Sequence, residues 1–221
     1  MHKIVDNLTL IQNEIQTKIE KNKFQKYKPN IIAVSKTFPM NDIIPLINHG
    51  HLHFGENKVQ EAIEKWSSIK EDFAKIKLHM IGKLQTNKVK FVLPLFDYIH
   101  SLDNIRLAEK IANEQEKKNK KVKIFIQVNV GSEDQKNGIE VENLQNFLKA
   151  CIEDFKLNII GLMCLPPSSK SSKEYFLKMR NLTEKMNLNE ISMGMSKDYL
   201  EAVDYKSTYL RIGSKLFGSR D

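Results

Sequence analysis

Cysteine is scarce in this sequence, with only Cys151 and Cys164 among 221 residues. Their separation fits no metal-binding or redox motif, and both lie in apolar stretches, so we interpret them as small core residues. A chain that does not depend on disulfides is typical of a reducing compartment. We therefore expect a cytoplasmic protein.

Long apolar runs are also missing. No window reaches the roughly 18 apolar residues of a membrane span, and residues 1–7 form no apolar signal segment. The only cluster rich in proline and serine, residues 166–172, fits a loop after a strand and divides nothing. Because 41% of the residues are hydrophobic, a sizeable core is available, and we expect one domain over residues 1–221 without membrane contact.

Acidic residues are outnumbered, 27 against 35 lysines and arginines, which gives a formal net charge of +8. Such a balance is found in proteins that bind nucleic acid, membrane surfaces or small anions. The lysines are spread along the whole chain, and the densest run, residues 117–121, contains no aromatic residue that would stack on a base. We expect no nucleic-acid partner.

What the sequence does contain is a regular alternation of short apolar runs and helical patterns. The apolar runs predict strands at residues 31–34, 51–54, 78–81, 98–102, 123–130, 158–165, from 190 to at least 193, and 207–212. The helical patterns fall at residues 1–22, 41–48, 57 to about 69, 87–93, 104–117 with Asp103 as N-cap, 141–155, 172–187 and 197–205.

Strands that alternate with helices imply βαβ units and a parallel sheet. Eight such units predict an α/β fold, a single (β/α)8 TIM-type barrel with an extra N-terminal helix that caps the barrel or packs outside it. The pattern leaves a doubly wound open sheet as the alternative.

Lys36 directly follows the first predicted strand, in which Ile31 to Val34 are all apolar. A lysine at the end of a buried strand is partly desolvated, which favours the neutral amine, the form that attacks a carbonyl. Such a lysine can equally extend its ammonium group to the barrel rim without any chemical role. The residue is therefore a candidate whose weight depends on what surrounds it.

Active sites of these barrels lie at the carboxyl ends of the strands. The residues at or just after the ends of the predicted strands, Glu56 and Asn57 among them, form a polar rim, in which Arg211 on the last strand neighbours Lys36 after the first. Gly213 and Ser214 form a turn after the last strand, where backbone N–H groups favour a phosphate. Ser196 adds a hydroxyl after the seventh strand. An ordinary turn at the start of a helix is the alternative for these residues.

Other motifs are weaker. His49, His51 and His53 alternate and would share one side of an extended segment, but His49 is expected to end a helix and no fourth metal ligand is nearby. Gly82-Lys83 lacks the glycine spacing of a phosphate-binding loop. Glu56, Glu61 and Asp198 could act as acid or base, although exposed carboxylates at helix starts are more common. We expect no metal site.

Eight segments together resemble the pyridoxal phosphate homeostasis proteins, the YggS/PROSC type. They are Ala33–Thr37, Phe54–Glu61, His79–Lys88, Ile99–Asp103, Gln127–Val130, Gly161–Met163, Ser192–Asp198 and Arg211–Gly218. The resemblance covers nearly the whole chain in order. It implies a barrel like the N-terminal domain of alanine racemase, without that enzyme's second domain.

The resemblance also implies a cofactor, pyridoxal 5'-phosphate (PLP), held as an imine on Lys36. Arg211 would face the pyridine nitrogen, and Asn57 would lie beside the ring. Ser196, Gly213 and Ser214 would hold the phosphate. Two departures from the family pattern, Lys83 in place of the more common histidine and the reversed order of Gly131-Ser132, put loop contacts in doubt but not the cofactor.

Two functions fit this resemblance. The first is a PLP carrier or regulator in intracellular PLP homeostasis, with little or no turnover. The alternative is a small PLP enzyme, an amino-acid racemase or lyase, which would need a second base that we do not find. For the carrier we expect a monomer whose partners are PLP, amino acids and, transiently, apo-enzymes that require PLP.

Overall fold

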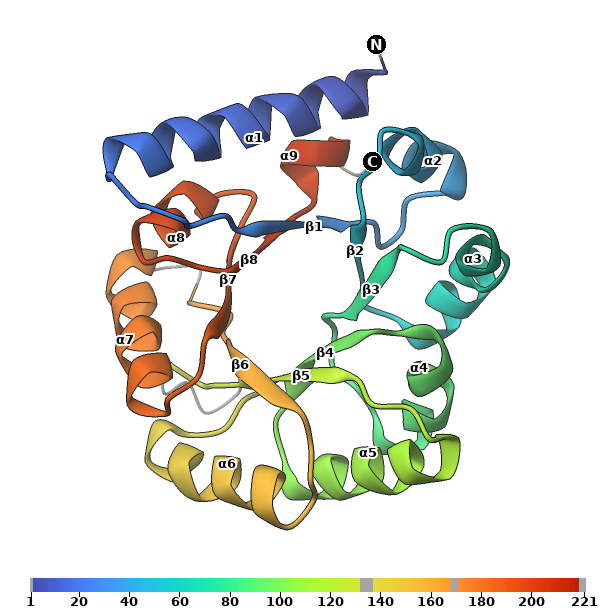
Figure 1. Ribbon diagram of the computed structural model, residues 1–221, viewed down its shortest axis with the longest axis vertical. Coiled ribbons are helices and arrows are strands. Elements are labelled where there is room, and N and C mark those ends of the chain that lie inside the picture. The colour runs from blue at the N-terminus through green and yellow to red at the C-terminus, as the bar shows by residue number, and fades with distance from the viewer. Residues whose placement is uncertain (1, 132–136, 168–170, 219–221) are drawn as a thin grey trace.

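The computed structural model describes residues 2–131, 137–167 and 171–218. Its eight strands form a closed, all-parallel barrel in chain order, in which the last strand pairs with the first (Figure 1). The strands are β1 Asn30–Val34, β2 His53–Glu56, β3 Lys77–Met80, β4 Tyr98–Leu102, β5 Lys123–Gln127, β6 Ile159–Met163, β7 Glu190–Met195 and β8 Tyr209–Ile212. The closure confirms the predicted barrel and excludes the open sheet.

Helices surround the strands (Figure 1). They are α1 Lys3–Lys21, α2 Met40–Asn48, α3 Val59–Asp72, α4 Val89–Leu95, α5 Ile105–Lys118, α6 Leu144–Glu153, α7 Ser172–Lys185, α8 Tyr199–Asp204 and α9 Ser214–Phe217, with 3-10 turns η1 Thr86–Lys88 and η2 Val141–Asn143. The extra helix α1 packs outside the barrel against α2, α8 and α9. None of the described helices combines the length and apolar character needed to cross a membrane.

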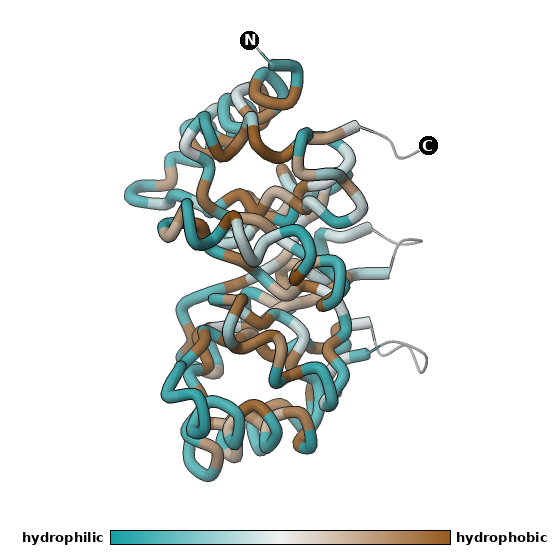
Figure 2. The backbone as a smooth tube through the Cα atoms, turned by 90° about the vertical axis from the view of Figure 1, so that its right-hand side faces the viewer, coloured by the Kyte–Doolittle hydropathy of each residue, from teal (hydrophilic) through white to brown (hydrophobic). Residues whose placement is uncertain are grey.

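Apolar side chains fill two regions. The larger lies between the strands and the helices, and brown hydrophobic stretches accordingly run through the interior in Figure 2, with teal segments toward the periphery. The smaller lies inside the barrel and consists of Ile32, Tyr98, Phe125, Met163 and Tyr209. Since side chains alternate along a strand, the interior position of Ile32 places Val34 and then Lys36 on the inward side at the carboxyl end of β1.

Some predicted boundaries were wrong. The N-cap of α5 is Asn104 and not Asp103, because the Asn104 side chain accepts the N–H of Leu107 at 2.9 Å. β5 ends at Gln127, three residues early, since Val128 makes only an isolated bridge to Ile139. β2 begins at His53 rather than at residue 51. Apolar character alone does not reveal where the ladder of hydrogen bonds stops.

Candidate cofactor site

One cavity of about 880 Å³ opens at the carboxyl ends of the strands. All six residues predicted for the site line it: Lys36, Asn57, Ser196, Arg211, Gly213 and Ser214. Arg211 lies on β8, and the other five lie in the segments that follow β1, β2, β7 and β8. The remaining wall combines polar residues that follow β6 and β7 with the apolar residues Val34, Ile81, Leu165, Pro166, Pro167 and Met195.

Lys36 is half-buried, and the residues on both sides of it are anchored. Ser35 donates its backbone N–H to Gly55 O and its hydroxyl to Glu56 Oε1, at 3.0 and 2.7 Å. Thr37 has a left-handed backbone, with φ of +68°, and its N–H donates to a carboxylate oxygen of Glu61. A tight turn held at both ends directs the Lys36 side chain into the cavity.

Glu56 forms the anchor on the outer side of the barrel. Its Oε1 atom accepts hydrogen bonds from Ser35 Oγ, from Lys65 Nζ at 3.1 Å and from the Trp66 indole N–H at 2.9 Å. Lys65 also donates to the carbonyl of Ser35 at 2.9 Å. Glu56 is therefore the last residue of β2, directed toward α3, and not part of the polar rim as we predicted. Through its hydrogen bond with Ser35 and its pairing with Lys65, Glu56 holds the residue that precedes Lys36 in place.

Arg211 is 4% exposed and has two fixed hydrogen bonds. Its guanidinium donates to Ser192 Oγ at 2.5 Å and to the carbonyl of Cys164 at 2.8 Å. Burial lowers the pKa of Arg211, yet arginine starts from so high a value that it stays cationic. The pairing of Ile32 with Arg211 across β1 and β8 places this cation one strand away from Lys36.

The hydroxyl of Ser196 lies at the turn that precedes α9. Its oxygen accepts the backbone N–H groups of Gly213 at 3.1 Å and Lys215 at 3.2 Å. Ser214 is exposed at the start of that helix, while Gly213 is buried beneath it. The two N–H groups that converge on the Ser196 hydroxyl, together with the hydroxyls of Ser196 and Ser214, form a suitable set of donors for a phosphate.

Two glycines set the shape of the rim. A Cβ atom on Gly82 would lie 2.3 Å from the carbonyl oxygen of Asn57, so the missing side chain allows the β3 loop to pack directly on Asn57. Gly194 has φ of +88°, and a Cβ there would lie 2.5 Å from that of Ala202. At both positions a side chain would clash with a neighbouring segment, so only glycine allows this close packing. The contacts responsible cannot be read from the sequence pattern around a single residue.

The candidate carboxylates separate into different places. Of Glu56, Glu61 and Asp198, only Asp198 is among the described residues that line the cavity. It is already held, because it accepts the backbone N–H of Met195 at 2.6 Å and the hydroxyl of Ser172 at 2.8 Å. Ser172, Lys197, Asp198 and Glu201 are lining residues that our predicted set omitted, since they follow β6 and β7 by several positions.

The loop departures lie away from this cavity or outside the described residues. Lys83 is exposed, donates to Asn137 Oδ1 at 2.7 Å and is not among the lining residues. Of the pair Gly131-Ser132, the serine lies outside the described residues. His49 ends α2 as predicted, and within the described ranges no group of three or more His, Cys, Asp or Glu is placed to hold a metal ion.

Comparison with known proteins places this geometry in a family. A model of the alanine racemase N-terminal domain matches residues 12–221. The pyridoxal phosphate homeostasis protein of Aquifex aeolicus is 35% identical over 224 residues, 97% of each chain. That of Escherichia coli K12 is 30% identical over 230 residues, 100% of this chain and 98% of the relative.

A solved structure supports the same assignment. PipY of Synechococcus elongatus PCC7942, with PLP bound, has a TM-score of 0.80 and 31% identity, and the match covers 92% of this chain and 100% of PipY. Sequence and structure agree over nearly the full length, and the chain belongs to the pyridoxal phosphate homeostasis proteins, within the alanine racemase N-terminal domain family.

Proposed function

We propose that this protein binds PLP covalently through Lys36 and acts in PLP homeostasis as a carrier or regulator of the cofactor. The supporting observation is the meeting, in one cavity, of a half-buried lysine, a buried arginine and a turn rich in N–H and hydroxyl donors. PLP carries an aldehyde, a ring nitrogen and a phosphate, and the lysine, the arginine and the turn would bind these three parts respectively.

The donor set fits the cofactor. Lys36 supplies the amine for the aldehyde. Arg211 would face the pyridine nitrogen and, as a permanent cation, keep that nitrogen unprotonated. Ser196, Gly213 and Ser214 would bind the phosphate, and Asn57, positioned by Gly82, would lie beside the ring. When bound, PLP supplies an electrophilic carbon that exchanges between amines.

The same arrangement favours a carrier over an enzyme. An unprotonated ring nitrogen makes PLP a weak electron sink, so Arg211 opposes the formation of carbanions. A racemase also requires a second acid on the opposite face of the cofactor. Among the described lining residues no tyrosine, histidine or cysteine is present, and Asp198 is engaged by Met195 and Ser172, so a catalytic acid would have to be Lys197 or Glu201.

The proposed carrier role implies which molecules the protein contacts and in which compartment it acts. Exchange at Lys36 would admit amino acids as small-molecule partners and permit PLP to pass to apo-enzymes during transient contacts. We propose that the protein is a cytoplasmic monomer, with the cavity mouth facing these acceptors. The alternative of a small racemase or lyase remains the competing hypothesis that experiment must decide.

Borohydride reduction tests the attachment directly. Protein loaded with PLP is reduced, digested and mapped by mass spectrometry, and the label is expected on Lys36. Lys36→Arg should carry no label, whereas the control Lys83→Arg, outside the cavity, should be labelled as the wild type is. A label on Lys197, which also lines the cavity, would overturn the assignment.

A further inference from the structure

A chain of hydrogen-bonded side chains, buried except for the half-buried His53, crosses the barrel interior below Arg211. His53 Nδ1 lies 2.9 Å from His79 Nε2, and His79 Nδ1 lies 2.9 Å from His100 Nε2. His100 Nδ1 lies 2.9 Å from Ser192 Oγ, the hydroxyl that accepts from Arg211. With Arg211 included, five strands contribute one residue each: β2, β3, β4, β7 and β8. We name this set, His53, His79, His100 and Ser192, the histidine chain.

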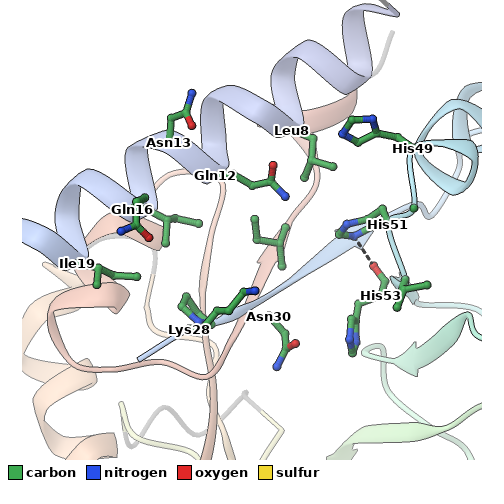
Figure 3. Close-up of a pocket in the computed structure, with 15 residues that line it drawn as sticks. Leu8, Gln12, Asn13, Gln16, Ile19, Lys28, Asn30, His49, His51 and His53 are labelled. Carbon is green, nitrogen blue, oxygen red and sulfur yellow. Dashed lines mark hydrogen bonds between the residues drawn. The ribbon is translucent and has the colours of Figure 1, made fainter. Parts of the chain in front are cut away.

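The histidine chain connects two cavities at opposite ends of the barrel. Its upper end, Arg211, lines the candidate cofactor site. Its lower end, His53, lines a cavity of about 540 Å³ near the amino ends of β1 and β2. Figure 3 shows this lower cavity between α1 on one side and the segment from His49 to His53 on the other, with the hydrogen bond from His51 Nε2 to the carbonyl of His53.

The direction of the hydrogen bonds follows from Arg211. Arginine has only donors, so Ser192 Oγ accepts there and its single hydroxyl hydrogen is free for His100 Nδ1. His100 Nδ1 is then an acceptor, which leaves the proton on Nε2 to donate to His79 Nδ1. By the same step His79 donates from Nε2 to His53 Nδ1. One cation therefore sets all three imidazoles to the Nε2–H tautomer.

The opposite direction leaves a hydrogen without a partner. If His100 donated from Nδ1, Ser192 Oγ would accept from both His100 and Arg211. Its own hydrogen would then need another acceptor, and none is found for it within the described part of the chain. A buried donor without a partner costs about 1–3 kcal/mol, enough to favour the first direction by about fivefold or more.

The chain is also kept neutral. His79 and His100 are 0% exposed. Burial lowers the pKa of both well below its usual range, and the positive charge of Arg211 lowers that of His100 further. Burial lowers the pKa of His53 too, and Lys77 and Lys123 add to this while Asp97 opposes it. The aromatic rings that pack on the three imidazoles are Tyr98, Phe125 and Tyr209.

We propose that His53, His79 and His100 are positioning residues for Arg211. The three imidazoles form a neutral, one-directional hydrogen-bond chain, and this chain orients the Ser192 hydroxyl so that its oxygen accepts from the guanidinium. The role of Arg211 toward the ring nitrogen of PLP rests on the function proposed above. The chain itself is a property of the protein without its cofactor. It makes the guanidinium position depend on residues at the far end of the barrel.

A glutamine can imitate the middle of this chain, and phenylalanine cannot. In His100→Gln the amide oxygen can accept from Ser192 and the amide nitrogen can donate to His79, which preserves the direction. His100→Phe keeps the ring stacked on Phe125 but leaves the Ser192 hydrogen and His79 Nδ1 without partners. The pair separates hydrogen bonding from packing.

The first measurement is a long-range ¹H–¹⁵N correlation spectrum of PLP-free protein with ¹⁵N-labelled histidine, assigned with His53→Gln, His79→Gln and His100→Gln. At neutral pH we expect three neutral Nε2–H tautomers. A Nδ1–H tautomer or a charged ring at His79 or His100 would overturn the proposal. This measurement stands even if the wild type binds no PLP, which would reject only the proposed function.

The second measurement compares PLP affinity and the absorbance maximum of bound PLP. His100→Phe should bind PLP about tenfold or more weakly, as expected for disturbing one hydrogen bond of a charged group, and should shift the maximum. His100→Gln should stay within about threefold of the wild type, as should the exposed control His49→Gln. If folded His100→Phe and His100→Gln match each other in both readouts, Arg211 is not positioned in this way.

Discussion

The hydroxyl oxygen of Ser196 accepts the backbone N–H of Gly213 at 3.1 Å, across the turn between β8 and α9. The N–H of Lys215 converges on the same oxygen at 3.2 Å. The hydroxyl oxygen of Ser196, which follows β7, thus occupies the place where two donors of the β8–α9 segment meet. In the PLP-bound state we expect a phosphate oxygen to share these donors.

Ser196→Ala should weaken PLP binding about tenfold or more, because losing one hydrogen bond to a charged group costs about 1.5–3 kcal/mol. Free pyridoxal, which has no phosphate, should bind the variant and the wild type alike. Titration followed by absorbance measures both ligands. Ser67→Ala, on the exposed face of α3, is the matched control. Equal weakening for PLP and pyridoxal would remove Ser196 from the phosphate site.

Lys65→Met should destabilise the fold by about 3 kcal/mol or more, since removing one partner of a buried ion pair leaves the other uncompensated. The Glu56 side chain is 0% exposed and that of Lys65 is 9% exposed. Urea unfolding measures the loss. Lys149→Met removes an exposed Lys–Glu pair, in which the side chains are 69% and 60% exposed, and should change stability by less than about 1 kcal/mol.

Adding Glu56→Gln to Lys65→Met should recover part of the lost stability, because the uncompensated carboxylate is then neutral. Lys65 also binds the carbonyl of Ser35, the residue before Lys36. The single variant should therefore show slower or less complete labelling of Lys36 by PLP and borohydride. Normal stability of Lys65→Met would mean that Glu56 is not held by this pair.

The barrel and most of the site could be predicted from the sequence. Each strand contributes its own apolar run, and Lys36 directly follows one, so local patterns place it at the rim. The polar residues after β7 and β8 are likewise close in sequence to their strands. The closed barrel then brings these segments together around one cavity. Predicting this arrangement requires only the order of the strands and not the details of side-chain packing.

The histidine chain could not be predicted in this way. Its members come from four strands and Arg211 from a fifth, and their contacts depend on the register between neighbouring strands, which is irregular between β7 and β8, the strands of Ser192 and Arg211. The direction of Glu56 was missed because the predicted strand ended at residue 54, whereas β2 continues to Glu56, whose side chain follows the alternation of the strand.

Acid should destabilise this protein through the same histidines. Burial lowers the pKa of His79 and His100 well below its usual range and that of His51 to about 4. The unfolded chain therefore binds more protons below about pH 6.5. Stability is complete above that pH and falls as the pH falls, by about 1.4 kcal/mol per pH unit for each histidine that stays neutral.

Urea unfolding between pH 7.5 and 5, a range of about one to two units around the ordinary histidine pKa, measures this slope. His79→Gln should reduce the slope because one titrating group is lost from the unfolded state only. His49→Gln, at an exposed position, should leave it unchanged. A slope that is identical in wild type and His79→Gln would contradict the neutral, buried state of His79.

Amino acids should exchange with Lys36 but should not be turned over. Exchange needs only an amine that reaches the cavity, and it should change the absorbance of bound PLP. Turnover requires in addition an electron sink and a placed acid, and Arg211, at the position proposed for it beside the ring nitrogen, would weaken the electron sink. We therefore expect undetectable or slow exchange of the α-hydrogen of amino acids for deuterium in D₂O, followed by NMR, together with transfer of PLP to an added apo-enzyme.

Arg211→Glu provides the decisive comparison, because a carboxylate at that position favours the protonated ring nitrogen and restores the electron sink. If the variant folds, α-hydrogen exchange should rise above the wild-type level while the transfer of PLP weakens. Lys36→Ala abolishes covalent attachment and serves as the blank. Wild-type exchange at about 1 s⁻¹ or faster, lost in Lys36→Ala, would overturn the carrier and establish a racemase-like enzyme, since only a completed catalytic site reaches such rates.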